Sequence, residues 1–271
     1  MSGKIGLIAG KNKFPLIFAQ SAREQGFQVV AAAHHGETDP ALEQWADAIK
    51  WVYVGQLGKI IRFFQKAGVT RAVMAGGISK GRLFSHLRPD WRALKIVGRA
   101  KHAGDDGILR AVAAELESEG ITIVSPTLFL TELLAPEGVL SRRQPNAAEL
   151  RDIEFGFAMA KEIGRLDIGQ CVVVRRQAVL AVEAIDGTDA TIRRGGILAG
   201  EQAVVVKVSK PDQDLRFDVP AVGLETIGVM REVKASVLAL EAGKTLMFDR
   251  TEMLQQADKA KIAVIGLSSL N

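Results

Sequence analysis

A short stretch in the second half of the chain carries the richest group of polar side chains. It contains Glu183, Thr188 and Asp189, and Arg193 and Arg194 follow about one helical turn later. Acids beside arginines suit a phosphoanhydride site, because a metal ion and guanidinium groups can neutralise the charge that develops on phosphate in the transition state. The same residues also suit a plain turn and a helix cap, since Thr188 or Asp189 can cap a helix. Both interpretations remain open from the residues alone.

A second polar group surrounds a loop that follows a strand-like segment. Lys207 and Lys210 precede the loop, and Asp218 closes it directly before a Val-Pro step that favours an extended backbone. We interpret the two lysines as substrate-binding residues, because ammonium groups attract phosphate. Asp218 could bind a metal ion or activate water, but taken in isolation its position favours an ordinary loop acid.

Two glycine-containing loops each follow a strand-like run. The loop at Gly10 enters a helix, so its N–H groups and the helix dipole could receive an anion. Gly76 and Gly77 lie at the carboxyl end of another predicted strand, the edge where ligands of open α/β sheets collect. We interpret all three glycines as substrate-binding, although simple turns explain them too. The first loop lacks the G-x-G-x-x-G and G-K-[ST] patterns, which argues against NAD binding and ATP chemistry.

Adjacent carboxylates at Asp105 and Asp106 begin a helical pattern between two glycines. Asp105 suits an N-cap, and Asp106 suits the positive end of the helix dipole. Such a pair also resembles the oxygen-rich environments that hold Mg²⁺ beside phosphates, so substrate contact stays open. His34 and His35 are assigned no site, because adjacent strand residues face opposite ways.

The elements that must position these residues alternate between short apolar runs and helical spacing. The first half predicts strands at 4–9, 27–33, 71–75 and 121–124 and helices at 14–25, 57–67 and 105–119. This alternation predicts parallel βαβ units in a Rossmann-like domain.

Apolar periodicity lapses around residues 135–145, where turn formers and charges gather. We therefore expect a Rossmann-like N-terminal domain at 1–138 and a mixed α/β C-terminal catalytic domain at 139–271. The second half predicts helices at 147–163, 223–240 and 251–258, strands at 170–175, 178–184, 203–208, 244–248 and 262–266, and a tight turn at 176–177.

Composition narrows the class of protein. The chain has 271 residues, of which 48% are hydrophobic, with 8 prolines and a formal net charge of +4. A single cysteine, Cys171, excludes an internal disulfide and favours a reducing cytoplasm, and 4 histidines make a Cys/His zinc site improbable. No apolar run is long enough to span a membrane, so any contact with a membrane is expected to be peripheral. No feature suggests nucleic-acid binding.

Several segments together resemble one family. They are the amino-terminal I-G-L-I-A-G run, Gly104-Asp105-Asp106, the stretch 162–170, residues 181–189, Arg193-Arg194, and Asp218-Val219-Pro220 with Gly223 and Thr226-Ile227-Gly228. The chain resembles the LpxI-type UDP-2,3-diacylglucosamine pyrophosphatases over essentially its whole length. The family's first loop is often richer in glycine than Lys11-Asn12-Lys13 of this chain.

The resemblance implies hydrolysis of UDP-2,3-diacylglucosamine to UMP and 2,3-diacylglucosamine 1-phosphate (lipid X) in lipid A synthesis, with Mg²⁺ required. It implies that Asp218 is the most important catalytic acid and that the amphipathic ligand is held between two domains. We further expect Asp189 and Arg193 to act in catalysis, Thr188 to contact substrate, and Asp218, Asp189 and Glu183 to bind the metal. A homodimer and peripheral contact with the inner membrane are also expected.

Two other classes of function remain open at this point. A nucleotide-sugar or phospholipid binding protein without catalysis would use the same basic residues to hold phosphate, and release of UMP distinguishes the two. A Rossmann-type oxidoreductase is disfavoured by the missing dinucleotide fingerprint.

Overall fold

The chain forms two α/β units, each built around its own sheet. The structure is a computed structural model that describes residues 3–79, 87–99 and 105–268. Unit 1 comprises Met1–Leu130 with Leu215–Phe217, and unit 2 comprises Thr131–Asp214 with Asp218–Asn271. The prediction of a two-domain α/β protein is confirmed.

Unit 1 contains a five-stranded, wholly parallel sheet in the order β3-β2-β1-β4-β5. Its elements are β1 (Lys4–Ala9), α1 (Phe14–Glu24), β2 (Gln28–His34), η1 (Pro40–Gln44), β3 (Ala48–Val52), α2 (Leu57–Ala67), β4 (Arg71–Ala75), α4 (Trp91–Arg99), α5 (Asp105–Ser118), β5 (Thr122–Ile123) and η2 (Pro126–Phe129). The strand order reverses between β1 and β4, which makes the carboxyl ends of these two strands the topological switch point of the sheet.

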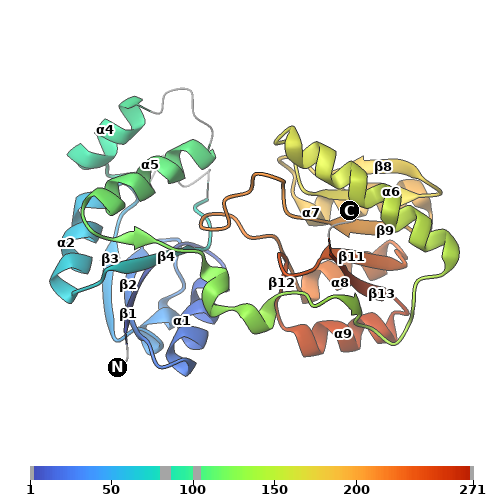
Figure 1. The fold of residues 1–271 in the computed structure, drawn as a ribbon, viewed down its shortest axis with the longest axis horizontal. Helices are drawn as coiled ribbons and strands as arrows, with labels where there is room; N and C mark the ends of the chain where they lie inside the picture. The colour runs from blue at the N-terminus through green and yellow to red at the C-terminus, as the bar shows by residue number, and fades with distance from the viewer. Residues whose placement is uncertain (1–2, 80–86, 100–104, 269–271) are drawn as a thin grey trace. The chain divides into compact units, whose positions relative to one another are not determined.

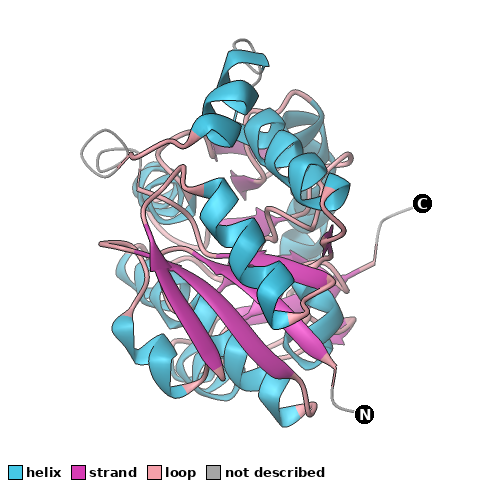
Figure 2. Cartoon of the chain, turned by 90° about the vertical axis from the view of Figure 1, so that its left-hand side faces the viewer, coloured by secondary structure: helices cyan, strands magenta, loops and turns pink. Residues whose placement is uncertain are grey.

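Apolar spacing determines how the helices of unit 1 cover its sheet. In α2, Ile60, Ile61 and Phe64 are buried, and they join β2, β4 and α5 residues in one apolar cluster. Helix α1 packs against β1, β2 and β4 (Figures 1 and 2). Helix α2 ends at Gly68, whose φ of 73° is the left-handed conformation that glycine adopts readily at a helix end.

Unit 2 contains a six-stranded mixed sheet in the order β6-β13-β11-β9-β7-β8 and a short β10-β12 pair. Its elements are η3 (Thr131–Leu133), β6 (Gly138–Val139), α6 (Ala147–Arg165), β7 (Cys171–Arg175), β8 (Ala178–Val182), α7 (Thr188–Ala199), β9 (Val204–Lys207), β10 (Ala221–Val222), α8 (Leu224–Glu232), β11 (Val237–Glu241), β12 (Leu246–Met247), α9 (Arg250–Lys259) and β13 (Ala263–Leu267). Strands β9, β11 and β13 are parallel, and β7 runs antiparallel to both of its neighbours.

Both faces of this sheet are covered, which explains why its strands are apolar throughout. Val172, Val174 and Val206 pack in the cluster that contains α6, whereas Val173 and Val205 pack in the cluster that contains α7, α8 and α9. Figure 1 shows α6 on one side of the sheet and α8 and α9 on the other. Alternate residues of one strand thus pack into the two hydrophobic clusters on opposite faces of the sheet.

Most predicted elements are confirmed, including the tight turn at Arg176 and Gln177, where φ is 52° and 56°. One prediction is wrong: residues 223–240 do not form a single helix. Helix α8 ends at Glu232, Lys234 takes a φ of 53°, and Val237–Glu241 becomes strand β11. The sequence prediction also omitted β3 and α4.

Candidate active site

The polar residues of unit 2 gather at one edge of its sheet. Strand β7 is antiparallel to both β8 and β9, so the carboxyl ends of β8 and β9 lie at the same edge. Glu183 directly follows β8, Lys207 is the last residue of β9, and Thr188 begins α7. Residues 24 positions apart in sequence are thereby brought into one group.

Lys207 is the centre of this group. Only 6% of the residue is exposed, and its ammonium donates hydrogen bonds to Thr188 Oγ1 at 2.8 Å and to the carbonyl of Ala221 at 2.9 Å. Thr188 in turn donates to Glu183 Oε1 at 2.7 Å. A buried ammonium is stable only with hydrogen-bond partners and nearby negative charge, and this network supplies both.

Asp189 and Asp218 occupy environments that oppose their ionisation. Burial raises the pKa of Asp189, nearby Glu225 raises it further, and Lys207 and Arg193 only partly offset this. Burial likewise raises the pKa of Asp218, against the opposing influence of Lys210 and Lys207. Asp218 as a whole residue is exposed to solvent, but protein atoms surround its carboxyl group. This burial of the carboxyl group is what raises the pKa of Asp218. Lys207 therefore lies within electrostatic reach of both acids.

Gln213 holds the carboxylate of Asp218. Its Nε2 donates to Asp218 Oδ2 at 2.7 Å, while its Oε1 accepts from the amide of Lys210 at 2.8 Å and from Ser209 Oγ at 3.1 Å. The backbone and hydroxyl donors fix which way the amide group of Gln213 points. Among the described residues, Asp218 Oδ1 has no hydrogen-bond partner, so this oxygen is available to water or a ligand.

A further acid at the same sheet edge was missed by the sequence prediction. Glu241 ends β11 with 1% of the residue exposed, and its Oε2 accepts from Lys161 Nζ at 2.6 Å and from the amide of Ser209 at 2.8 Å. Burial opposes ionisation, yet Lys161 and Lys244 hold the pKa of Glu241 below its ordinary value. It anchors the start of the loop that carries Gln213 and Asp218. Its role was hidden because residues 237–240, which lead to it in β11, were predicted to be helical.

The predicted arginines lie apart from this network. Arg193 Nε is 3.3 Å from Glu232 Oε2, and both side chains are largely exposed. Arg194 pairs with Asp186 at 2.8 Å. Arg193 is near enough to Asp189 to lower its pKa, so it borders the group without entering it.

The glycine loops of unit 1 meet at the switch point of its sheet. The amide of Gly10 donates to the carbonyl of Ala75 at 2.8 Å, and the amide of Lys11 donates to the carbonyl of Gly77 at 2.7 Å. A Cβ on Gly10 would collide with the carbonyl of Gly76, at 2.7 Å. The two loops therefore require glycine to pack against each other, and the Gly10 and Lys11 amides are already engaged.

The remaining predicted residues of unit 1 can be placed only in part. Asp105 and Asp106 are the first two residues of α5, and their side chains lie outside the described part of the chain. Gly10, Gly76 and Gly77 belong to unit 1 and the Lys207 group to unit 2, so a ligand held between the domains stays a prediction.

Two family models match consecutive parts of the chain. The LpxI N-terminal domain matches residues 4–133, and the LpxI C-terminal domain matches residues 136–265. The chain belongs to the LpxI family. It is 34% identical over 275 residues to the UDP-2,3-diacylglucosamine pyrophosphatase LpxI of Caulobacter vibrioides (strain ATCC 19089 / CIP 103742 / CB 15), with 97% of each chain covered.

Solved structures add little to this assignment. The biotin carboxylase domain of a thermophilic 2-oxoglutarate carboxylase bound to ADP aligns with 64% of this LpxI-family chain at 13% identity and a TM-score of 0.28. The biotin carboxylase subunit of pyruvate carboxylase aligns with 68% at 15% identity and a TM-score of 0.28. This chain spans only 35% and 36% of those two chains, respectively.

The oxygen ligands of this LpxI-family chain suit Mg²⁺ chemically, but they do not form a complete cage. Within the described residues, no three His, Cys, Asp or Glu side chains are grouped closely enough to hold an ion. Burial raises the pKa of Asp189 and of Asp218, and the neighbouring cations offset this only in part. Mg²⁺ beside phosphates commonly takes only one or two protein carboxylates and completes its shell with phosphate and water. The residues therefore fit an ion that binds together with a diphosphate.

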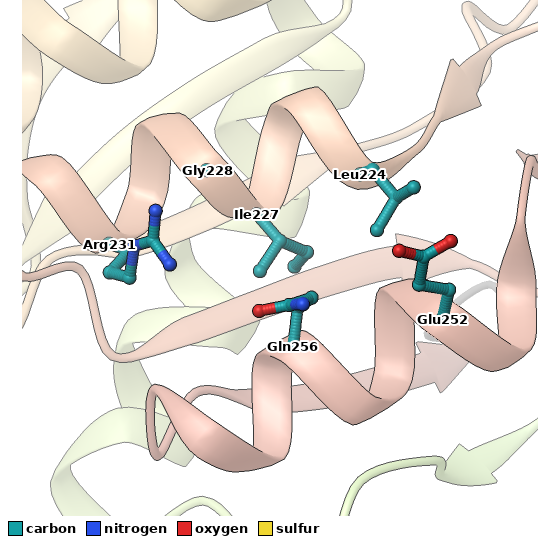
Figure 3. Close-up of a pocket in the computed structure, with 6 residues that line it drawn as sticks. All are labelled: Leu224, Ile227, Gly228, Arg231, Glu252 and Gln256. Carbon is teal, nitrogen blue, oxygen red and sulfur yellow. The ribbon is translucent and has the colours of Figure 1, made fainter.

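An open groove of about 280 Å³ lies elsewhere in unit 2, between α8 and α9 (Figure 3). Leu224 and Ile227 of α8 face Glu252 and Gln256 of α9 across it. None of the residues that line it belongs to the predicted site of this LpxI-family chain.

Proposed function

We propose that this chain hydrolyses the pyrophosphate bond of UDP-2,3-diacylglucosamine to UMP and lipid X, a step of lipid A synthesis. The observation that carries the proposal is the 34% identity to a UDP-2,3-diacylglucosamine pyrophosphatase over 97% of both chains. The Lys207 group and the neighbouring acids Asp189 and Asp218 support it, because carboxylates and cations near one another suit a metal-assisted diphosphate site.

The chain's own residues suggest a division of labour. Asp218, with Oδ2 held by Gln213, would use Oδ1 to orient a metal ion or an attacking water. Its raised pKa makes its carboxylate a better proton acceptor than an ordinary aspartate. Asp189 and Glu183 would complete the negative side of the site, and Lys207 and Thr188 would hold Glu183 in place. When bound, Mg²⁺ would polarise the diphosphate and neutralise its charge.

The basic residues would contact the diphosphate and the charge that develops on it. Lys210 is ion-paired with Asp167 at 2.6 Å, and Arg193 with exposed Glu232. Exposed pairs of this kind contribute about 0–1 kcal/mol, so either cation can exchange its partner for phosphate. Arg193 would stabilise negative charge in the transition state. Gly10, Gly76, Gly77, Asp105 and Asp106 are proposed to contact the remainder of the substrate from unit 1.

The decisive experiment is to incubate the purified chain and Mg²⁺ with UDP-2,3-diacylglucosamine and to detect UMP and lipid X by mass spectrometry. We expect both products in equal amounts, and we expect a chelator to prevent their formation. Binding of the nucleotide lipid without any release of UMP would instead favour the non-catalytic binding protein. Hydrolysis in heavy-oxygen water identifies the phosphorus that is attacked: we expect the label in lipid X, and label in UMP would exclude attack at the β-phosphorus.

Assembly and location are proposed at a coarser level. In the described part of the chain, no helix is both long and apolar enough to cross a membrane. We propose a cytoplasmic protein that reaches its lipid substrate through peripheral contact with the inner membrane and that forms a homodimer. Light scattering of the purified chain tests the dimer directly.

A further inference from the structure

Unit 1 carries a strongly basic groove on its surface. The groove, of about 610 Å³, is lined by Lys50, Lys59, Arg62, Phe63 and Lys66 together with Ala67. Positions 59, 62, 63 and 66 form one stripe along α2, on the side opposite its buried residues. Lys50 lies on the edge strand β3, with its Nζ 5.9 Å from the centre of the Phe63 ring. Within the described residues none of the four cations forms an ion pair with an acid.

The neighbouring helix α4 presents apolar and basic side chains to solvent. Trp91 is 80% exposed and Leu94 is 50% exposed, and exposed Lys95 shares their side of the helix. We call these three residues the α4 face. Asp90, the acid directly before α4, is engaged in the fold, since Oδ2 accepts from the amide of Gly58 at 2.6 Å and Oδ1 from the amide of Ala93 at 3.1 Å. Within the described residues, Lys95 forms no ion pair with an acid.

Packing makes the groove and the α4 face neighbours. Helix α4 packs against α2 and α5, and Ile96 joins the core that α2 supplies (Figure 1). At Gly58, where α2 meets the start of α4, an added Cβ would lie 3.0 Å from Asp90 Oδ2, 3.5 Å from Arg62 Nη1 and 3.7 Å from Arg92 Cδ. Arg92 pairs with Glu115 of α5 at 2.6 Å and with Glu119, the residue that follows the end of α5 at Ser118, at 2.5 Å. The α4 face therefore belongs to a helix that packs directly against α2, the helix that carries three of the groove's cations.

We propose that the basic groove and the α4 face together dock unit 1 on the anionic phospholipids of a bilayer. Free lysines and an arginine attract anionic headgroups, and each basic residue near such a surface strengthens binding about fivefold. Tryptophan is the side chain best suited to the boundary between headgroups and acyl chains, and Leu94 adds apolar area beside it. A soluble anion would use the cations but would leave Trp91 and Leu94 in water, so the combination selects a lipid surface.

Sedimentation with vesicles tests the proposal on the full chain. One set of vesicles contains phosphatidylcholine alone, and the other replaces part of it with phosphatidylglycerol. We expect the chain to bind the anionic vesicles at least about tenfold more tightly, and we expect salt to weaken this binding. Equal binding to both sets, or binding to neither, would overturn the proposal. Because no nucleotide lipid is present, such a failure would leave the proposed hydrolysis untouched.

Charge-matched variants locate the surface. K59Q/R62Q/K66Q removes three exposed cations of the groove and should weaken binding to anionic vesicles about a hundredfold. R23Q/R151Q/K259Q removes the same charge from exposed positions elsewhere and should bind within about twofold of the unaltered chain, since distant charges are screened. Equal binding by these two variants would show that net charge alone acts and would refute the location.

The α4 face is tested separately. W91S/L94S should lower vesicle binding about tenfold or more through lost apolar contact, whereas L128S, which alters another exposed leucine of unit 1, should not. Circular dichroism should show both variants folded. If W91S/L94S changed the oligomeric state in ultracentrifugation but left vesicle binding intact, the α4 face would be an interface between copies of the chain, and the proposal would be wrong.

Discussion

Asp218 combines a raised pKa, one restrained oxygen and one available oxygen. Gln213 restrains Oδ2, and the chain then passes directly to Val219 and Pro220. A carboxylate held in this way can orient a ligand with little loss of side-chain entropy. Asp218 is therefore the residue at which a single substitution should separate chemistry from folding.

D218N keeps the shape of the side chain and removes its charge. We expect kcat for UMP release to fall by at least about a hundredfold, because metal assistance supplies several kcal/mol of transition-state stabilisation. Thermal unfolding should show an intact fold. Near-normal turnover would remove Asp218 from the mechanism.

Gln213 is expected to act through Asp218. Q213L removes the amide that holds Oδ2, and loss of such a supporting contact typically lowers activity or metal affinity about 10- to 100-fold. The predicted change includes a higher Mg²⁺ concentration for half-maximal rate, which a merely structural role would not produce. Q255L alters an exposed glutamine of α9 and should leave both quantities unchanged.

At the scale of elements, close packing of helix on sheet depends on glycines that have no conformational role. Gly195 lies in the middle of α7, and a Cβ there would collide with the side chain of Val173 on β7. Gly228 lies in α8, where an added Cβ would meet nothing within 4 Å. Alanine substitutions at the two positions therefore distinguish the effect of steric crowding on stability from the effect of helix propensity.

G195A should destabilise the protein and G228A should not. Overpacking costs about 1–3 kcal/mol, whereas replacing glycine by alanine inside a helix gains up to about 1 kcal/mol. Urea unfolding of both variants measures the difference. A stabilised G195A would mean that α7 can move away from β7 at little cost.

At the scale of the whole molecule, the acids of the site should lower the free energy of unfolding of the protein at neutral pH. Folding raises the pKa of Asp189 and Asp218, so the folded state binds their protons more tightly than the unfolded state does. Stability is therefore lost as pH rises from the ordinary aspartate pKa through the raised folded-state values. Function is then obtained at some cost in stability.

D189N and D218N should accordingly raise Tm at neutral pH in metal-free buffer, and the gain should vanish below the ordinary aspartate pKa of about 3.9. Glu149 provides the opposite control. Burial opposes its ionisation, but Arg143 and the amide of Asn146 hold the pKa of Glu149 below its usual value. E149Q should lower Tm at neutral pH, with the loss disappearing on acidification. Lower Tm in both aspartate variants at neutral pH would contradict the sign of the argument.

Much of the fold follows from local patterns. The buried stripe of α2 and its terminal glycine predict that helix to the residue, and the two-residue turn at 176–177 is evident between apolar runs. The same reasoning fails at 223–240. The leucines and alanines of this segment favour a helix when only interactions between residues close in sequence are considered. Val237–Glu241 is instead a strand buried between β9 and β13. Its neighbours in space, which are distant in sequence, override the local preference.

The sequence by itself determined the family, the two α/β units and the types of residue available for chemistry. Only the tertiary structure decided that Lys207 is buried against Thr188 and that Gln213 holds Asp218, while Arg193 pairs with Glu232 instead. The physical reason lies in what apolar periodicity can report. It shows which face of a helix or strand is buried, because the buried face is determined by the residues of that helix or strand. A hydrogen bond between side chains depends on where strand ends meet, and a sheet edge brings together residues whose separation in sequence carries no periodic signal.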